Sequence, residues 1–310
     1  MKTKSCFKNV VFPLLTAVLA FALSGCIKQK ILVRVKPDGS GTILVSAMYQ
    51  KKIVEMVDKQ MAVQREQFAK QGMNSEAMDK ALKDPFFNEE SFKQQAKMLG
   101  SDIEYLKAKK VKTSDGRGFI AVYAFKNIED VKLDIAKLAS PASKFGPQTP
   151  SEDAVSFKFT KGEVAKLTVT IPKMERASDD DSDDSKGPTP MTEEERAQLA
   201  GQGAMFGLTG KEVTKEEVLK KMYSDMSFSI ALQVDGTLVK SNATYQDPKK
   251  KGRCTLFSID FGTVLEDDKS CGRMARNKNP NFLSAILVKE KIQGIKLEDK
   301  PEITVEFKKK

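Results

Sequence analysis

The chain has 310 residues, 30% of them charged and 40% hydrophobic, which is long enough for one or two globular domains and too highly charged for a membrane-embedded bundle. Its 52 Lys and Arg outnumber its 42 Asp and Glu, giving a formal net charge of +10. It contains no His, and this removes the commonest general base and the commonest transition-metal ligand.

Residues 1–25 have the pattern of a lipoprotein signal peptide. Three Lys and no acid precede an apolar run of 14 residues, Val10 to Leu23, whereas a membrane span needs about 20. The run ends in a sequence that resembles a bacterial lipobox, Leu23-Ser24-Gly25-Cys26. We therefore predict cleavage before Cys26 and its modification with diacylglycerol and a further acyl chain such as palmitate. The alternative is an ordinary signal peptide with a chance Cys.

Cleavage at this point leaves a mature chain of 285 residues with a net charge of +7, because the leader carries three Lys and no acid. Residues 26–30 are then the lipid anchor and a short tether, which reaches at most about 14 Å. Export argues against nucleic acid as the partner of the basic chain. Anionic headgroups, or simply solvent, remain as explanations for the charge. Position 27 is Ile rather than Asp, which by resemblance to enterobacterial sorting favours the outer membrane, facing the periplasm, over the inner membrane.

Two cysteines, Cys254 and Cys271, remain after the leader and the anchor are set aside. The exported compartment permits a disulfide between them, and a bridge needs Cα atoms within about 7 Å. A strand over 254–261 travels roughly 23 Å, and a helical return over 262–271 covers only about 15 Å. The bridge therefore requires a partly extended return, and both the bridged and the free state stay open.

The rest of the chain alternates between strand and helix patterns. Asp-Gly turns and short polar turns separate runs with period-two hydrophobicity, which predicts β-hairpins. Runs with helical spacing lie between them, and Asn127 is expected to cap one of these helices. The expected hairpins cover residues 31–49, 103–126, 154–171 and 226–245, followed by strands at 254–261 and 302–307. The expected helices cover residues 51–72, 75–83, 88–98, 127–138, 214–223 and 281–290, with a further one starting at 192.

These elements predict the α+β class, with a largely antiparallel sheet of repeated hairpins and amphipathic helices packed on it. We expect a single domain over residues 31–307, interrupted by a disordered acidic linker at about 173–191. Asp179, Asp181 and Asp183 alternate within this linker as in a calcium loop. The sixth and twelfth positions of that loop are, however, Asp184 and Pro190 instead of Gly and Glu, so no metal site is expected.

Three blocks of the sequence resemble LppM-type envelope lipoproteins. These are the lipobox followed by ILVRVKPDGSGT, the run MSFSIALQVDGTLVKSNATY with TLFSIDFGTVL after it, and IQGIKLEDKPEITVEF near the end. The resemblance covers about a quarter of the chain and includes the order of the blocks. It implies a lipid-anchored α+β domain with an apolar cavity or face that meets envelope lipids, and it implies no catalytic residues.

An enzyme is not expected. Without His, a Ser nucleophile would need a Lys or a carboxylate as its base, and the pair Ser143-Lys144 has no partner motif. We expect no cofactor. The function we expect is non-catalytic binding of an envelope lipid or other apolar ligand. The alternative is a structural or assembly adaptor that binds another envelope protein. A large enclosed apolar cavity would favour the lipid, and a filled core with a flat apolar outer patch would favour the protein partner.

Overall fold

The computed structural model describes residues 27–72, 74, 84–135, 138, 154–172, 193–205, 207–208, 213–276 and 292–310. Its elements confirm the α+β class expected from the sequence. In chain order they are β1 (Ile27–Val35), β2 (Gly41–Gln50), α2 (Lys51–Lys70), α4 (Glu89–Met98), β3 (Glu104–Thr113), β4 (Gly116–Phe125), the 3-10 turn η1 (Ile128–Asp130), β5 (Ser156–Thr160), β6 (Ala165–Thr170), α6 (Glu193–Met205), α7 (Lys215–Tyr223), β7 (Ser227–Val234), β8 (Thr237–Ser241), β9 (Arg253–Asp260), α8 (Phe261–Glu266), α9 (Asp268–Arg276), β10 (Ile295–Leu297) and β11 (Glu302–Lys308).

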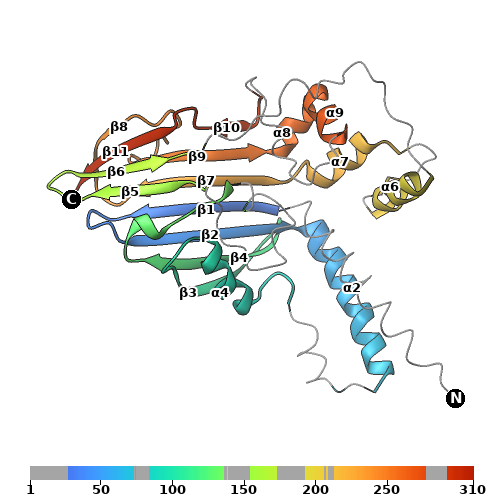
Figure 1. Cartoon of the computed structure of the whole chain (residues 1–310). Coiled ribbons are helices and arrows are strands. Elements are labelled where there is room, and N and C mark those ends of the chain that lie inside the picture. Colours follow the sequence, from blue (N-terminus) through green and yellow to red (C-terminus); the bar gives the residue numbers. More distant parts are fainter. Residues whose placement is uncertain are drawn as a thin grey trace.

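The larger sheet has seven strands in the order β10-β9-β7-β1-β2-β4-β3 (Figure 1). Every neighbouring pair is antiparallel except β1 and β7, which run parallel. The expected hairpins β1-β2 and β3-β4 are confirmed. In the first of them Gly39 has a φ of +87°, and Asp38 accepts hydrogen bonds from the backbone N–H and the hydroxyl of Ser40, so this Asp serves the turn.

The smaller sheet has four strands in the order β5-β6-β11-β8, all antiparallel. It joins the hairpin β5-β6, which ends before Pro172, to β8 and β11, which lie beyond residue 236. The larger sheet also combines early and late strands. Its early strands, β1 to β4, meet its late strands, β7, β9 and β10, at the pairing of β1 with β7. Neither the part of the chain up to Pro172 nor the part from Glu193 onward therefore contains a complete sheet.

One expected hairpin does not form. The alternating run 226–234 is β7, and β8 follows it after Asp235 and Gly236, but the two strands do not pair. β7 lies between β1 and β9 in the larger sheet, while β8 pairs with β11 in the smaller one. The Asp-Gly pair thus carries the chain from one sheet to the other. Local turn chemistry could not reveal this, because the partners of β7 and β8 are distant in sequence.

Two further segments differ from the expectation. Residues 27–30 belong to β1, and Ile27 is only 5% exposed and lies opposite Tyr49, so the expected tether is part of the sheet. The helix expected over 127–138 forms only in part. Its start is a single 3-10 turn, which Asn127 caps by accepting from the Glu129 N–H. The chain is helical again at residues 135 and 138, where the Leu138 N–H donates to the Asp134 carbonyl at 2.9 Å. Between these two parts Val131 and Leu133 form isolated bridges to Gly100 and Val155 instead of continuing a helix.

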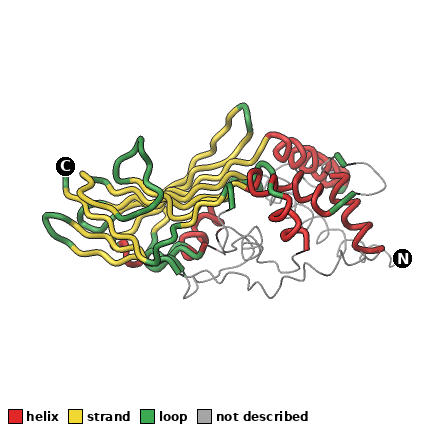
Figure 2. Tube along the Cα trace, turned by 90° about the horizontal axis from the view of Figure 1, so that it is seen from above, coloured by secondary structure: helices red, strands yellow, loops and turns green. Residues whose placement is uncertain are grey.

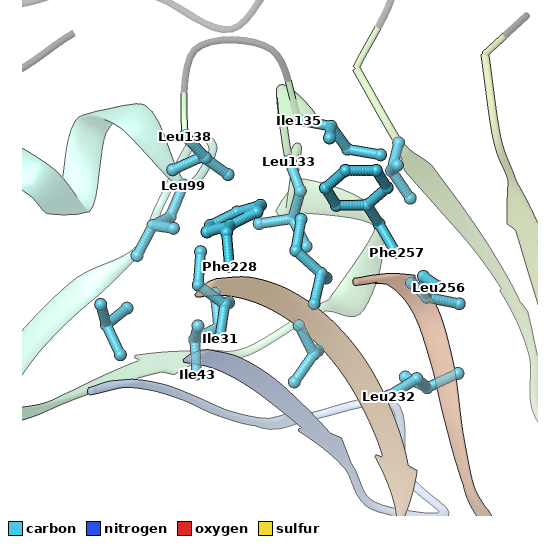
Figure 3. Packing of buried hydrophobic residues seen from close by; sticks show 14 of the residues in the cluster. Ile31, Ile43, Leu99, Leu133, Ile135, Leu138, Phe228, Leu232, Leu256 and Phe257 are labelled. Carbon is cyan, nitrogen blue, oxygen red and sulfur yellow. The ribbon is translucent and has the colours of Figure 1, made fainter. Parts of the chain in front are cut away.

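The inner faces of the two sheets share one core. Inward residues of the larger sheet, such as Val33, Val45 and Ile230, are fully buried, as are Leu167 and Val305 of the smaller sheet. Figure 3 shows Leu99, Leu133, Ile135 and Leu138 above the strands, facing Ile31, Ile43, Phe228 and Phe257.

Helix α4 covers part of the same inner face. Its Phe92 packs on Phe119 with ring centroids 4.5 Å apart, and Tyr123 donates a hydrogen bond of 2.8 Å to Gln95. Asn88 caps this helix by accepting from the Glu90 N–H. α4 therefore forms, with the smaller sheet, the layer that closes the inner face of the larger one.

The strands occupy one end of the molecule and most of the helices the other (Figure 2). β1 begins at the helical end, where α2 leaves β2 and projects away from the sheet (Figure 1). Only Ile53 and Val57 of α2 are buried. At the same end α7 starts with a capping box between Thr214 and Glu217 and packs with α6, α8 and α9.

Candidate binding surface

The lipobox and Cys26 lie outside the described residues, as do the acidic segment 173–191, Ser143-Lys144 and the helices expected at 75–83 and 281–290. What the structure places is the residue next to Cys26. Ile27 is the first residue of β1 and lies opposite Tyr49 of β2, and the pairing of β1 with β7 begins one residue later, at Lys28. No helix among the described residues is long and apolar enough to cross a membrane.

Cys254 and Cys271 are both free and buried. Cys254 lies at the start of β9, and Cys271 lies in α9, after the chain has run the length of β9 and through α8. After β9 the chain continues through the helices α8 and α9. A helix advances little per residue, so this segment does not bring Cys271 back to Cys254. Burial raises the pKa of the Cys254 thiol to about 12, with a smaller effect of Glu298, and burial also raises the pKa of Cys271. A neutral, buried thiol is a poor nucleophile.

The described part of the chain holds no group of three His, Cys, Asp or Glu side chains placed to bind a metal. Its most distinctive surface is the side of the larger sheet that points away from the smaller sheet and from α4. We call this side the outer face. Because Ile31 and Val33 point into the core, the side chains between and beside them point outward. The outer face of β1 carries Lys28, Lys30, Leu32 and Arg34.

Strand register extends this face across the sheet. Leu32 lies opposite Leu44 of β2, and Leu44 lies opposite Val122 of β4, next to Ile120. All four side chains are half-buried, whereas their inward neighbours are buried. We call Leu32, Leu44, Ile120 and Val122 the outer apolar row. Single apolar side chains on a surface are ordinary, but these four adjoin one another on three neighbouring strands.

Lysines border the outer apolar row on both sides. Lys107 and Lys109 of β3 lie opposite Val122 and Ile120, and Lys28 and Lys30 of β1 lie on its other side. Within the described residues none of these four lysines forms an ion pair with a carboxylate. The outer face therefore joins half-buried apolar side chains to lysines without ion-pair partners in the described chain, the combination that favours an anionic, amphipathic partner.

The smaller sheet gives an internal comparison. On β6 and β11 its outward side chains are threonines and charged residues of both signs, with Lys166 opposite Glu306 and Thr168 opposite Thr304. On β8 a single apolar side chain, Val239, is 50% exposed and has no apolar row beside it on β11. This is an ordinary solvated face. The apolar character of the larger sheet's outer face is therefore a property of that sheet and not of every strand in the protein.

The four sheet edges are poorly suited to accept a partner strand. Edge strand β3 carries four lysines and β10 has three residues. The backbone N–H of Phe159 in β5 already donates to Glu129, and β8 is short and has an irregular register beside β11. Lysines, bulges and short length are the ways in which proteins protect sheet edges. A partner of this protein is thus better accommodated on a sheet face than by strand addition.

Comparison with known proteins identifies no family. No family model matches the chain, and no curated protein matches it. Among solved structures the chain is similar to the folded domain of the LppM protein of Mycobacterium tuberculosis, determined by NMR, with a TM-score of 0.31 and 7% sequence identity over 92% of this chain and 91% of that one. This is a weak likeness of fold and carries no information on function.

Proposed function

We propose that this protein is a lipid-anchored, non-catalytic binding protein of the bacterial cell envelope, and that its outer face binds envelope lipid. The observation that carries the proposal is the position of β1. This strand starts at the residue after Cys26 and places Lys28, Lys30 and Leu32 on the outer face. An acyl anchor on Cys26 would therefore hold one end of that face at the membrane surface.

The chemistry of the outer face supports the same partner. Lysines at the border of an apolar row attract phosphate-bearing headgroups, and each contributes about 1 kcal/mol near an anionic surface. The half-buried apolar side chains can then contact the acyl region. Catalysis has no support in the residues, because the chain has no His and its buried thiols are held neutral.

The residue at position 27 bears on location. Ile27 in place of Asp favours the outer membrane, with the domain facing the periplasm, over retention in the inner membrane. This part of the proposal rests on resemblance to enterobacterial sorting. Separating the two membranes on a density gradient and probing each for the protein tests it, and recovery in the inner membrane would contradict it.

The second candidate is an adaptor for another envelope protein. One observation favours it: the four side chains of the outer apolar row adjoin one another on the surface of the sheet, and an apolar surface patch is expected for a protein partner. Crosslinking in intact membranes followed by pull-down would recover an enriched envelope protein if the adaptor is correct. Recovery of lipid alone would favour lipid binding.

Intact mass of the membrane-extracted protein tests the main proposal most directly. Under denaturing conditions we expect cleavage before Cys26 and the added mass of acyl chains. Under native conditions we expect a further small adduct that is lost on denaturation, which is the bound lipid. A Cys26→Ala variant is the control, since it should lack the acyl mass. An unacylated mature chain would contradict the lipid anchor. An acylated chain without an adduct would contradict lipid binding and favour the adaptor.

A further inference from the structure

A hollow of about 480 Å³ lies at the end of the outer face that is remote from Ile27. Leu32, Leu44 and Val234 contribute its apolar lining, and the loops at 235–236 and 250–251 border it. Its lining residues on β1 are Leu32 and Arg34, which lie about 17 Å and about 23 Å along the strand from Ile27. The hollow is therefore well separated from the proposed anchor.

The hollow is strongly basic. Its lining includes one acidic side chain, Asp235, and four basic side chains besides Lys310. These four are Arg34, Lys250, Lys251 and Arg253. Arg34 pairs with Asp235 through a contact of 2.9 Å between Nη2 and Oδ1. The other three cations form no ion pair with any carboxylate in the described part of the chain. A cluster of like charges without counterions attracts anions from solution.

The two arginines are held on a rigid frame. Arg34 of β1 lies beside Gln233 of β7, and Gln233 lies beside Arg253 of β9, so the three side chains share one row across three strands. With strands about 4.8 Å apart, the arginines are about 10 Å apart at their Cα atoms. This spacing allows both guanidinium groups to reach one ligand placed between them.

The lysine-bearing turn is fixed against the same strand. The Val234 N–H donates to the carbonyl of Gly252 at 2.9 Å, and Gly252 has a φ of +79°. A Cβ atom at Gly252 would lie 2.7 Å from the side chain of Val234, so the turn approaches β7 as closely as a glycine allows. The amide of Gln233 also donates to the Lys251 carbonyl at 3.5 Å. Lys250 and Lys251 are thus presented at the rim of the hollow by a turn of defined geometry.

We propose that this hollow binds a multiply charged phosphate group. Guanidinium groups match the geometry of phosphate oxygens and can donate two hydrogen bonds to one phosphate. Arg34 and Arg253 would hold the phosphate, and Lys250 and Lys251 at the rim would neutralise its remaining charge. The phosphate can belong to a soluble phosphate ester or to the headgroup of a phospholipid, since both present the same oxygens.

The test is titration calorimetry of the acylated mature protein in neutral detergent, with pyrophosphate as the soluble probe and dihexanoyl-phosphatidylglycerol, kept below its micelle concentration, as the headgroup probe. The Arg253→Gln variant should bind the effective probe at least tenfold more weakly. Lys166→Gln is the matched control, because it removes one positive charge from the outward side of the smaller sheet, and it should change affinity less than twofold. Circular dichroism of both variants verifies that they are folded.

Each outcome decides the proposal. Binding of either probe that depends on Arg253 and not on Lys166 supports it, and the probe that binds identifies the source of the phosphate. Equal weakening by both substitutions would show that only net charge matters and would overturn it, as would the absence of binding by both probes. The proposal does not rest on lipid binding by the outer apolar row. Pyrophosphate can bind to the hollow when no lipid adduct is found, and an adduct can persist in the Arg253→Gln variant.

Discussion

At the scale of single residues, position 27 is subject to two constraints. Ile27 follows the proposed lipidated cysteine, where enterobacterial sorting distinguishes Asp from other residues, and it is also the first core residue of β1. In the structure its side chain is buried at the position opposite Tyr49, which suits an apolar residue. The identity of residue 27 therefore reflects the fold at least as directly as it reflects sorting.

This predicts that Ile27→Asp destabilises the fold, because it places a carboxylate at a position that is only 5% exposed. We expect a loss of about 2–4 kcal/mol in the free energy of unfolding, the range for a buried group that loses its packing and gains an unpaired charge. Urea unfolding followed by circular dichroism measures this loss. Lys28→Asp, at the neighbouring exposed position, is the control and should change stability by about 0.5 kcal/mol or less. Equal midpoints for the two variants would contradict the buried position of Ile27.

The two buried cysteines allow a second prediction at this scale. Because burial raises both thiol pKa values, iodoacetamide at pH 8 should modify neither Cys254 nor Cys271 in the folded protein, and both after unfolding in guanidinium. Peptide mass mapping measures the modification. Rapid labelling of either thiol in the folded protein, or a mature mass lower by two hydrogens, would contradict the free and buried state.

The raised pKa of Cys254 also makes the free energy of unfolding depend on pH, and the sign of this dependence follows from the shift. The folded pKa of Cys254, about 12, is higher than its ordinary value of 9.0, so the folded state binds the thiol proton more tightly than the unfolded state. The corresponding stability is fully present below pH 9 and is lost as the pH rises through about 12.

At the scale of secondary-structure elements, local patterns in the sequence predicted most of the described strands and helices. Alternation with Asp-Gly turns and short polar turns predicted the hairpins β1-β2, β3-β4 and β5-β6, since in each the partner strand is the next one along the chain. Helical spacing likewise predicted α2, α4 and α7. These features depend on residues within one or two turns of each other, which is the range over which periodicity is informative.

Long-range pairing was not predictable in this way. The parallel contact of β1 with β7 and the transfer of β8 to the smaller sheet, beside β11, join segments about 200 and about 65 residues apart. The helix expected over 127–138 has the right cap and apolar spacing, yet it is interrupted between its first turn and residue 135, because Val131 and Leu133 bridge to other segments. Tertiary pairing overrides helix propensity in that segment.

Substitution by alanine is expected to have opposite effects at two glycines, Gly201 and Gly41, because a Cβ atom has room at the first and not at the second. Gly201 lies inside α6, and a Cβ atom added there would have no neighbouring atom within 4 Å. Gly201→Ala should therefore stabilise the helix by about 0.5–1 kcal/mol, because alanine loses less backbone entropy than glycine on folding. Urea unfolding and amide hydrogen exchange in α6 measure the gain. Unchanged or faster exchange in α6 would contradict it.

Gly41 is the contrasting position for that experiment. It is the first residue of β2, and a Cβ atom there would lie 1.9 Å from the carbonyl oxygen of Arg34 and 2.5 Å from the ring of Phe125. Gly41→Ala should therefore destabilise the protein by about 1–3 kcal/mol through overpacking. Local sequence patterns do not reveal this contact, because Phe125 reaches Gly41 only through the pairing of β2 with β4.

At the scale of the whole molecule, the candidate surface was only partly visible in the sequence. The alternation Lys28, Lys30, Leu32, Arg34 marks one outward face of β1, and the anchor motif marks the end at which that face begins. The outer apolar row also needs Leu44, Ile120 and Val122, which strand register brings together. The hollow likewise depends on β9 lying two strands from β1. Such surfaces require the topology, and composition alone shows only that the chain is basic.

The outer face makes a prediction that involves the complete protein. In acylated protein reconstituted into vesicles containing phosphatidylglycerol, an amine-reactive probe should label Lys28, Lys30, Lys107 and Lys109 several-fold less than in phosphatidylcholine vesicles, because anionic headgroups attract this face. Lys158, Lys166 and Lys240 of the smaller sheet are internal controls and should label equally in both. Raising the salt to about 1 M, where the Debye length is about 3 Å, should remove the protection. Equal labelling of both sets in both vesicles would contradict lipid binding, and protection seen only in native envelopes would favour the protein partner.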